Sequence, residues 1–200
     1  ANRWWRRRLP CGRGHSPITG RDLCKAVYQA VFDVVGDREA SDEVDSVVAA
    51  WALPDSPPLI VVDVGPQPDA LSGLDVPGNA ICRTSVPQSE LLGLRPELFV
   101  THGGQHAFME SMQAGVPVVI CSPMKDPPLI AGMAVSSGVG IKVQSPACRS
   151  RESLTAYRAE VRGAVLEALT KPHYASCSFE VSKKMSQTGG VEAAVRLLCG

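Results

Sequence analysis

The chain has 200 residues, enough for one good hydrophobic core or at most two very small ones. Its 20 Lys and Arg balance its 20 Asp and Glu, so the net charge is zero and argues against nucleic acid or an anionic membrane as the partner. Hydrophobic residues make up 44% but aromatic residues only 5%, so the core must be mainly aliphatic. The sequence has no apolar run near the roughly 20 residues that a membrane-spanning helix needs.

The seven cysteines are dispersed, without a C-x-x-C pair and without histidines at zinc-ligand spacing. They are Cys11, Cys24, Cys82, Cys121, Cys148, Cys177 and Cys199. An odd, scattered set argues against a secreted disulfide framework. We therefore expect buried free thiols in a reducing compartment, and hence a cytoplasmic location.

Residues 1–20 form a basic N-terminal segment without a clear structural pattern. No apolar signal-peptide core follows Arg6–Arg8, so an unstructured end is expected, and contact with phosphate or lipid headgroups is the alternative. Because the chain starts at Ala1 rather than at Met, we expect it to be a piece of a longer protein.

The next part of the chain carries helical patterns and then a strand. Apolar residues of Asp22–Val35 and Asp42–Leu53 recur at helical spacing, which predicts two amphipathic helices. After the proline-rich break at 54–58, Leu59–Val64 predicts a strand that Gly65 and Pro66 end.

Strands and helices then alternate. Strands are predicted at 80–82, 98–101, 116–121 and 140–143, and helices at 105–114 and 127–137. This order is typical of βαβ units, and the continuously apolar runs Leu59–Val64 and Val118–Ile120 are typical of central parallel strands. Further helices are predicted at 153–169, with Ser153 as the cap, and at 178–185 and 191–198. We expect an α/β domain over 21–200, a Rossmann-like parallel sheet flanked by helices.

The junction between the strand 98–101 and the helix 105–114 is the strongest candidate site. In an open parallel sheet, ligands bind outside the carboxyl ends of the strands. Gly103 and Gly104 allow close approach of the backbone, the start of the helix attracts anions, and His102 can donate to a phosphate oxygen. Glu110, about a turn and a half into the helix, suits hydroxyl groups. The pattern describes a pocket for a diphosphate joined to a ribose; a helix start that needs tight packing is the alternative.

His102-Gly103-Gly104 with Glu110, followed by residues 114–119, is similar to the donor-binding signature of the UDP-glycosyltransferase family and its macrolide-glycosyltransferase relatives. Upstream, residues 76–79 and 86–92 resemble the segment that precedes this signature. Downstream, residues 122–126, 138–140, 171–174 and 189–194 keep the family's order and spacing. The resemblance extends from about Leu59 to Leu198.

This resemblance implies the C-terminal half of a GT-B glycosyltransferase, in which two Rossmann-like domains face each other across a cleft. The other half would hold a small-molecule or lipid acceptor and the catalytic base, so no catalytic residue is assigned here. The resemblance implies a UDP-sugar as the donor substrate and neither metal nor cofactor. By position, the resemblance implies that the diphosphate is bound by His102, Gly103, Gly104, Gln105 and His106. It implies that Glu110 binds the ribose and that Val86 and Gln88 lie at the edge of the nucleobase. Asp126 would bind the transferred sugar.

The sequence departs from the family pattern at four places. Ser85 stands where many members have a Trp that stacks on the base, and Ala107 stands where the family has a small polar residue. Pro127 stands in place of a Gln, and Ile130 stands in place of an Asn. Each buried hydrogen bond is worth about 0.5–1.5 kcal/mol, so losing two or three of them would lower donor affinity roughly tenfold to a thousandfold. His15 is the one local candidate for a base, but we expect an ordinary loop histidine.

Three hypotheses remain: a hexosyltransferase half that needs an acceptor domain, a single-domain subunit completed by a partner chain, or a module that binds nucleotide sugars without turnover. Pro127 and Ile130 favour the third, and the retained His102 and Glu110 favour the first two. The start at Ala1 favours the first over the second.

Overall fold

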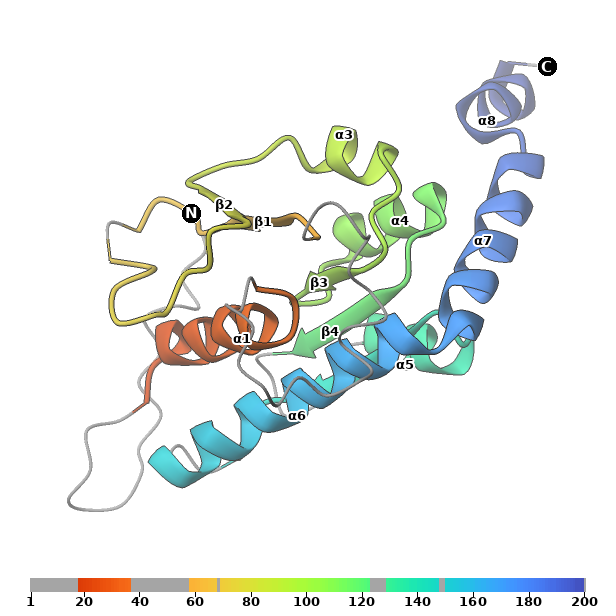
Figure 1. The fold of residues 1–200 in the computed structure, drawn as a ribbon. Coiled ribbons are helices and arrows are strands. Elements are labelled where there is room, and N and C mark those ends of the chain that lie inside the picture. The colour runs from red at the N-terminus through yellow and green to blue at the C-terminus, as the bar shows by residue number, and fades with distance from the viewer. Residues whose placement is uncertain (1–17, 37–57, 68, 123–128, 148–149, 200) are drawn as a thin grey trace. The chain divides into compact units, whose positions relative to one another are not determined.

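The computed structural model describes residues 18–36, 58–67, 69–122, 129–147 and 150–199 (Figure 1). They form two compact units, one from residues up to 86 together with 143–166 and the other from 87–142 together with 167 onward. The single domain predicted over 21–200 stays a prediction, and the helix predicted at 42–53 lies outside the described residues. In the described part of the chain, no helix is both long and apolar enough to cross a membrane.

The first unit is built on helix α1 (Gly20–Val35) and the parallel strands β1 (Ile60–Asp63) and β2 (Ala80–Arg83). The helix predicted at 22–35 is confirmed, and Thr19 begins it with a capping box: the Thr19 backbone N–H donates to the Asp22 carboxylate at 2.6 Å, and the Asp22 amide donates to Thr19 Oγ1. The apolar side of α1 packs on the sheet. Phe32, Ile60, Val62, Val64 and Ala70 form this core.

A polar row along α1 fastens the loop between β1 and β2 to the helix. Its members, Arg21, Lys25 and Gln29, are four residues apart and so share one face of the helix. Gln29 binds the backbone of Asp75 in both directions, accepting from its N–H at 2.9 Å and donating to its C=O at 3.3 Å. The buried Gln29 amide is therefore satisfied by the loop that it holds.

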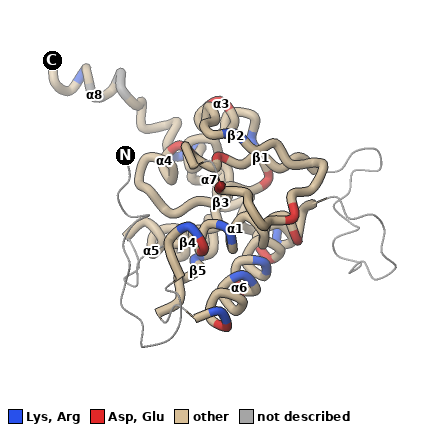
Figure 2. The backbone as a smooth tube through the Cα atoms, turned by 90° about the vertical axis from the view of Figure 1, so that its left-hand side faces the viewer, with Lys and Arg blue, Asp and Glu red and all other residues tan. Residues whose placement is uncertain are grey.

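Helix α6 (Arg151–Thr170) begins in the first unit. The prediction that Ser153 caps this helix is wrong by one turn: Ser150 precedes the helix, and the two serines exchange bonds between amide and hydroxyl at 2.9 and 3.2 Å. Ser153 is thus the third helical residue, whose side chain reaches back. Basic and acidic residues are interspersed along α6 (Figure 2). Arg158, one of them, donates to the Asp33 carboxylate of α1 at 2.6 Å.

The second unit contains a three-stranded sheet in the order β3-β4-β5, made of β3 (Phe99–Thr101), β4 (Val118–Ser122) and β5 (Gly140–Gln144). β3 and β4 are parallel, with Thr101 opposite Ile120. The helices of this unit are α3 (Gln88–Gly93), α4 (Gln105–Ala114), α5 (Leu129–Ser136), α7 (Pro172–Gln187) and α8 (Gly190–Cys199). Parallel strands that alternate with helices confirm the predicted α/β class.

The core of the second unit surrounds β4, whose five residues are all buried. Side chains of α4, α5 and α7 pack on it. Two serines of α7 also donate to backbone carbonyls, Ser178 to Val139 at 3.4 Å and Ser182 to Gln113 at 2.7 Å. Small hydroxyl side chains let α7 lie close to the turns that precede β4 and β5.

Two details differ from the sequence-based expectations. The run 59–64 was expected to be buried on both faces, but β1 alternates between buried and exposed, and Val61 is 38% exposed. This prediction is wrong because the described residues cover only the face of β1 that meets α1 and the following loop. The short helix α3 was not predicted, since six residues are too few for a helical repeat to stand out.

Candidate functional site

The β3–α4 junction places a backbone turn directly over β4. β3 ends at Thr101, α4 begins at Gln105, and Gly103 between them has a φ of +87°. A Cβ atom at this position would lie 2.6 Å from Ile120 Cγ2. Both the positive φ and the closeness of Ile120 require glycine here, so the turn and the core beneath it are built together.

His102 lies at the surface of this turn. Its ring is close to Gly104, where an added Cβ would meet Nε2 at 3.0 Å. Although the residue is exposed as a whole, the protein around the imidazole partly desolvates it and lowers the pKa of His102 below its ordinary value. A neutral imidazole keeps one N–H donor, which is sufficient for a phosphate oxygen.

The first turn of α4 presents its amide groups without a competing side chain. Gly104 is the N-cap and makes no side-chain cap bond, and the first turn contains no acidic residue. Gln105 and His106 are exposed. Since the first amides of a helix have no partner within the helix and carry the positive end of its dipole, this turn suits an anion.

Unlike the first amides of α4, the Gly103 amide has a hydrogen-bond acceptor within the turn. It donates to Thr101 Oγ1 at 3.4 Å in a buried position. Thr101 and Ile120 shape the turn from below, and neither role was predicted from the sequence. A hydroxyl residue at the last position of a strand before Gly-Gly is the signal that would have pointed to Thr101.

Glu110 and Gln88 meet on the same side of the second unit. Gln88 Nε2, at the start of α3, donates to Glu110 Oε2 in α4 at 2.7 Å. Both residues are half-buried. The structure therefore joins the residue predicted for the ribose to one predicted for the nucleobase edge, although 22 positions separate them.

Four other positions singled out in the sequence are Val86, Asp126, Pro127 and Ile130. Asp126 and Pro127 lie outside the described residues. Val86 belongs to the first unit. Ile130 packs against the core around β4, so its side chain supports the fold where the family has a polar residue. The roles predicted for these residues stay predictions.

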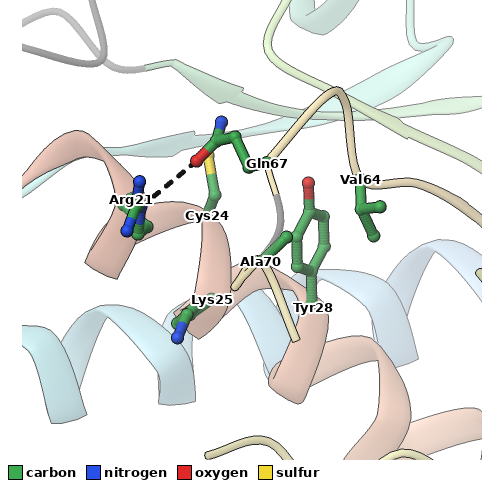
Figure 3. Close-up of a pocket in the computed structure, with 7 residues that line it drawn as sticks. All are labelled: Arg21, Cys24, Lys25, Tyr28, Val64, Gln67 and Ala70. Carbon is green, nitrogen blue, oxygen red and sulfur yellow. Dashed lines mark hydrogen bonds between the residues drawn. The ribbon is translucent and has the colours of Figure 1, made fainter. Parts of the chain in front are cut away.

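A shallow pocket in the first unit contains none of the predicted residues (Figure 3). It is lined by Arg21, Cys24, Lys25, Tyr28, Val64, Gln67 and Ala70. Both cations are engaged: Arg21 donates to Gln67 and pairs with Asp69, and Lys25 donates to the Ser72 carbonyl. Burial raises the pKa of Cys24 to about 12, so its thiol is not a nucleophile. The pocket therefore offers packing rather than chemistry.

Residues 37–167 match the sequence model of the family described as "UDP-glucoronosyl and UDP-glucosyl transferase". Among curated proteins, NDP-glycosyltransferase YjiC of Bacillus licheniformis is 34% identical over 135 residues, which are 68% of this chain and 32% of that protein. The chain spans about a third of the length of this relative and of the NDP-glycosyltransferase YjiC of Bacillus subtilis.

Solved glycosyltransferases have a similar fold. The "glycotransferase of kitacinnamycin" is 26% identical with a TM-score of 0.58, over 70% of this chain and 34% of that one. The spinosyn rhamnosyltransferase SpnG is 20% identical with a TM-score of 0.62, over 90% of this chain and 40% of that one, which is a likeness of fold alone. A further SpnG structure is a complex with thymidine diphosphate, with a TM-score of 0.56 and 19% identity over 84% of this chain and 37% of that one.

Proposed function

Because the chain belongs to the UDP-glucoronosyl and UDP-glucosyl transferase family, we propose that it is the nucleotide-sugar-binding half of a hexosyltransferase that uses a UDP-type donor. The observation that carries this proposal is the β3–α4 junction. There an uncapped helix start follows His102, and Glu110 further along the same helix is held by Gln88. An anion site and a hydroxyl site thus lie on one helix.

In this proposal the first turn of α4 and His102 hold the diphosphate. The amides of Gln105 and His106 and the imidazoles of His102 and His106 donate to its oxygens. As the bond to the sugar breaks, negative charge grows on the leaving diphosphate, and the helix dipole and these donors stabilise it. The protein itself therefore compensates the negative charge of the leaving diphosphate.

Glu110 accepts hydrogen bonds from the ribose hydroxyls. It follows His106 by four residues on α4, so the two side chains share a face and are about 6 Å apart along the helix axis. A diphosphate and the ribose next to it can span that distance. Val86 and Gln88 lie near the base in this proposal, and Asp126 faces the transferred sugar.

The acceptor and the catalytic base are proposed to come from outside this chain, because the family resemblance assigns both to the other half of the enzyme. Either an acceptor domain or a partner chain would supply them. A binding module without turnover is the second candidate, and the packing of Ile130 into the core favours it, since this position offers no hydrogen bond to a sugar. Transfer of glucose from UDP-glucose by the 200-residue chain once an acceptor domain or partner chain is supplied would exclude the inactive module.

Isothermal titration calorimetry tests donor binding directly. UDP, UDP-glucose and UDP-N-acetylglucosamine are titrated into the wild type and into Glu110→Ala. A hydrogen bond to a charged group is worth about 1.5–3 kcal/mol, so Glu110→Ala should weaken UDP binding about ten- to a hundredfold. Glu160→Ala is the control, because Glu160 is likewise a glutamate within a helix, but it is exposed and has no ion pair or side-chain hydrogen bond in the described part of the chain. It should bind as the wild type does.

Two results would contradict the proposal. One is the absence of heat with every nucleotide at protein concentrations that reveal millimolar affinity. The other is equal weakening by Glu110→Ala and Glu160→Ala, which would place the ligand away from α4.

A further inference from the structure

The end of α3 carries an arginine in an unusual backbone conformation. Arg95 follows the last turn of α3 with a φ of +54°, and it is the one non-glycine residue with a positive φ in the described part of the chain. At the end of a helix this conformation usually belongs to glycine or asparagine. The guanidinium of Arg95 lies over the ring of Phe179 in α7, with Cζ 6.0 Å from the ring centroid. Strained residues cluster at functional sites, so this placement directs attention to the surface around Phe179.

A second cation lies over the same ring. Lys183, one turn further along α7, has its Nζ 4.6 Å from the centroid of Phe179. The ring nevertheless stays 44% exposed, and Leu94, directly before Arg95, is 80% exposed. Single exposed apolar residues are ordinary, but an aromatic ring and an aliphatic side chain beside an arginine have the composition of a protein–protein interface.

The charges of this surface are balanced rather than of one sign. Glu97, two residues after Arg95, is exposed, and neither of the two side chains has an ion pair in the described part of the chain. Glu180 pairs with Lys183 at 2.9 Å. All these residues belong to the second unit. We name the following set the α3–α7 patch: Leu94, Arg95, Glu97, Phe179, Glu180 and Lys183.

A balanced patch suits a second copy of the same patch. A two-fold symmetric contact uses the same residues on both sides, so its surface must be complementary to itself. A patch of one sign would repel itself, whereas Arg95 of one copy can pair with Glu97 of the other, and the two-fold axis repeats this pair. The chain carries no net charge, so no overall repulsion keeps two copies apart. An anionic membrane or an acidic partner would be repelled by the carboxylates that lie among the cations.

We propose that the α3–α7 patch is an interface for a second copy of this chain, with Leu94 and Phe179 as its apolar part and two ion pairs between Arg95 and Glu97 across the two-fold axis. Because its apolar side chains are few, we expect a weak dimer that exchanges with single copies.

This interface is separate from the proposed anion site at the start of α4. An added Cβ at Gly115, which ends α4, would lie 3.4 Å from Phe179 Cα, so the patch adjoins the far end of this helix. The ten residues of α4 put about 15 Å between its two ends. Dimer formation therefore does not depend on the proposed function, and Arg95→Glu should leave UDP binding in calorimetry unchanged.

Sedimentation velocity of the 200-residue chain tests the proposal from micromolar to submillimolar concentration. The wild type should form more dimer as its concentration rises. Arg95→Glu and Glu97→Arg each set like charges against each other at both ion pairs, so each should weaken the dimer about tenfold. An equimolar mixture of the two variants should associate again, because the carboxylates of one then face the cations of the other. Arg95→Glu/Glu97→Arg, which exchanges the two charges, should dimerise by itself.

Arg151→Glu and Glu160→Arg are the matched controls. Both residues are exposed on α6 and have no ion pair among the described residues. Their substitutions change the net charge of the chain by the same amounts as the patch variants do, so they separate a local contact from an effect of overall charge. Both controls should dimerise as the wild type does, and circular dichroism shows whether every variant is folded.

Three results would overturn the inference: a wild type that stays a single copy at submillimolar concentration, patch variants that dimerise as strongly as the wild type, or a mixture of the two patch variants that does not associate. A single-copy wild type that sediments with vesicles of phosphatidylcholine and phosphatidylserine, and loses this binding in Arg95→Glu, would assign the patch to an anionic surface instead. In each of these cases the proposed function would stand, because it is measured by UDP binding.

Discussion

Replacing Gly103 by alanine tests whether the turn at the β3–α4 junction has the described geometry. The substitution forces a residue with a Cβ to a φ of +87°, and the new methyl group would lie 2.6 Å from Ile120 Cγ2. Backbone strain of this kind costs about 1–3 kcal/mol, and overpacking a dense core typically costs about 1–3 kcal/mol more. We expect Gly103→Ala to lower the free energy of unfolding by about 2–6 kcal/mol.

The assay is urea-induced unfolding followed by circular dichroism. Gly132→Ala is the control within the same unit, because Gly132 lies in α5, is exposed, and has no atom within 4 Å of an added Cβ. Since glycine is a poor helix former, this change should stabilise the protein by about 0.5–1 kcal/mol. The same type of substitution should therefore act in opposite directions at the two positions.

A double-mutant cycle separates the clash from the backbone strain. Ile120→Ala alone should cost about 2–5 kcal/mol by leaving a cavity under the turn. In Gly103→Ala/Ile120→Ala the new methyl has room, so the loss should be smaller than the sum of the single losses by about 0.5–3 kcal/mol. A loss below about 0.5 kcal/mol for Gly103→Ala, or strictly additive losses in the double variant, would refute this description of the turn.

Two further predictions concern the stability contributed by the cap of α1 and by the imidazole of His102. Thr19→Ala should lower the free energy of unfolding by about 0.5–2 kcal/mol, because it removes the capping box of α1. Thr19→Ser keeps the hydroxyl group and should retain most of the stability that the cap contributes. Thermal unfolding of both variants measures these effects, and wild-type stability of Thr19→Ala would contradict the prediction. The pKa of His102 is lower in the folded chain than in the unfolded chain. At a pH between these two pKa values, the unfolded chain therefore binds more protons than the folded chain. The free energy of unfolding should fall as the pH drops through this window. His102→Gln should flatten this dependence in urea unfolding curves measured from about pH 7.5 to about pH 5, and an identical slope would count against the assignment.

Local patterns predicted most of the described elements. Apolar periodicity located α1 and α4, and the alternation of strands and helices predicted the parallel pairs. These predictions succeeded because helical and strand periods are properties of a short stretch of sequence. The prediction that both faces of β1 are buried was wrong, because other elements of the fold decide which faces of a strand are covered. The sequence around Val61 carries no signal for whether its side chain is covered.

The candidate site was predictable in part. The junction and the residues on α4 followed from the Gly-Gly pair at the end of a strand. The bond between Gln88 and Glu110 did not, because it joins residues from two helices, and one of these helices is too short to be predicted. Ile120 under Gly103 was equally inaccessible, since the pairing register that brings it there is a tertiary property.

The central claim is that a nucleotide diphosphate binds where β3 meets α4. Titration of UDP into ¹⁵N-labelled protein, followed by amide NMR spectra, tests this most directly. The claim predicts that the largest shift changes fall on the amides of residues 102–110, with the first turn of α4 foremost, and that Glu110→Ala reduces them while Glu160→Ala does not. Shift changes centred on other residues, or none at millimolar UDP, would contradict it.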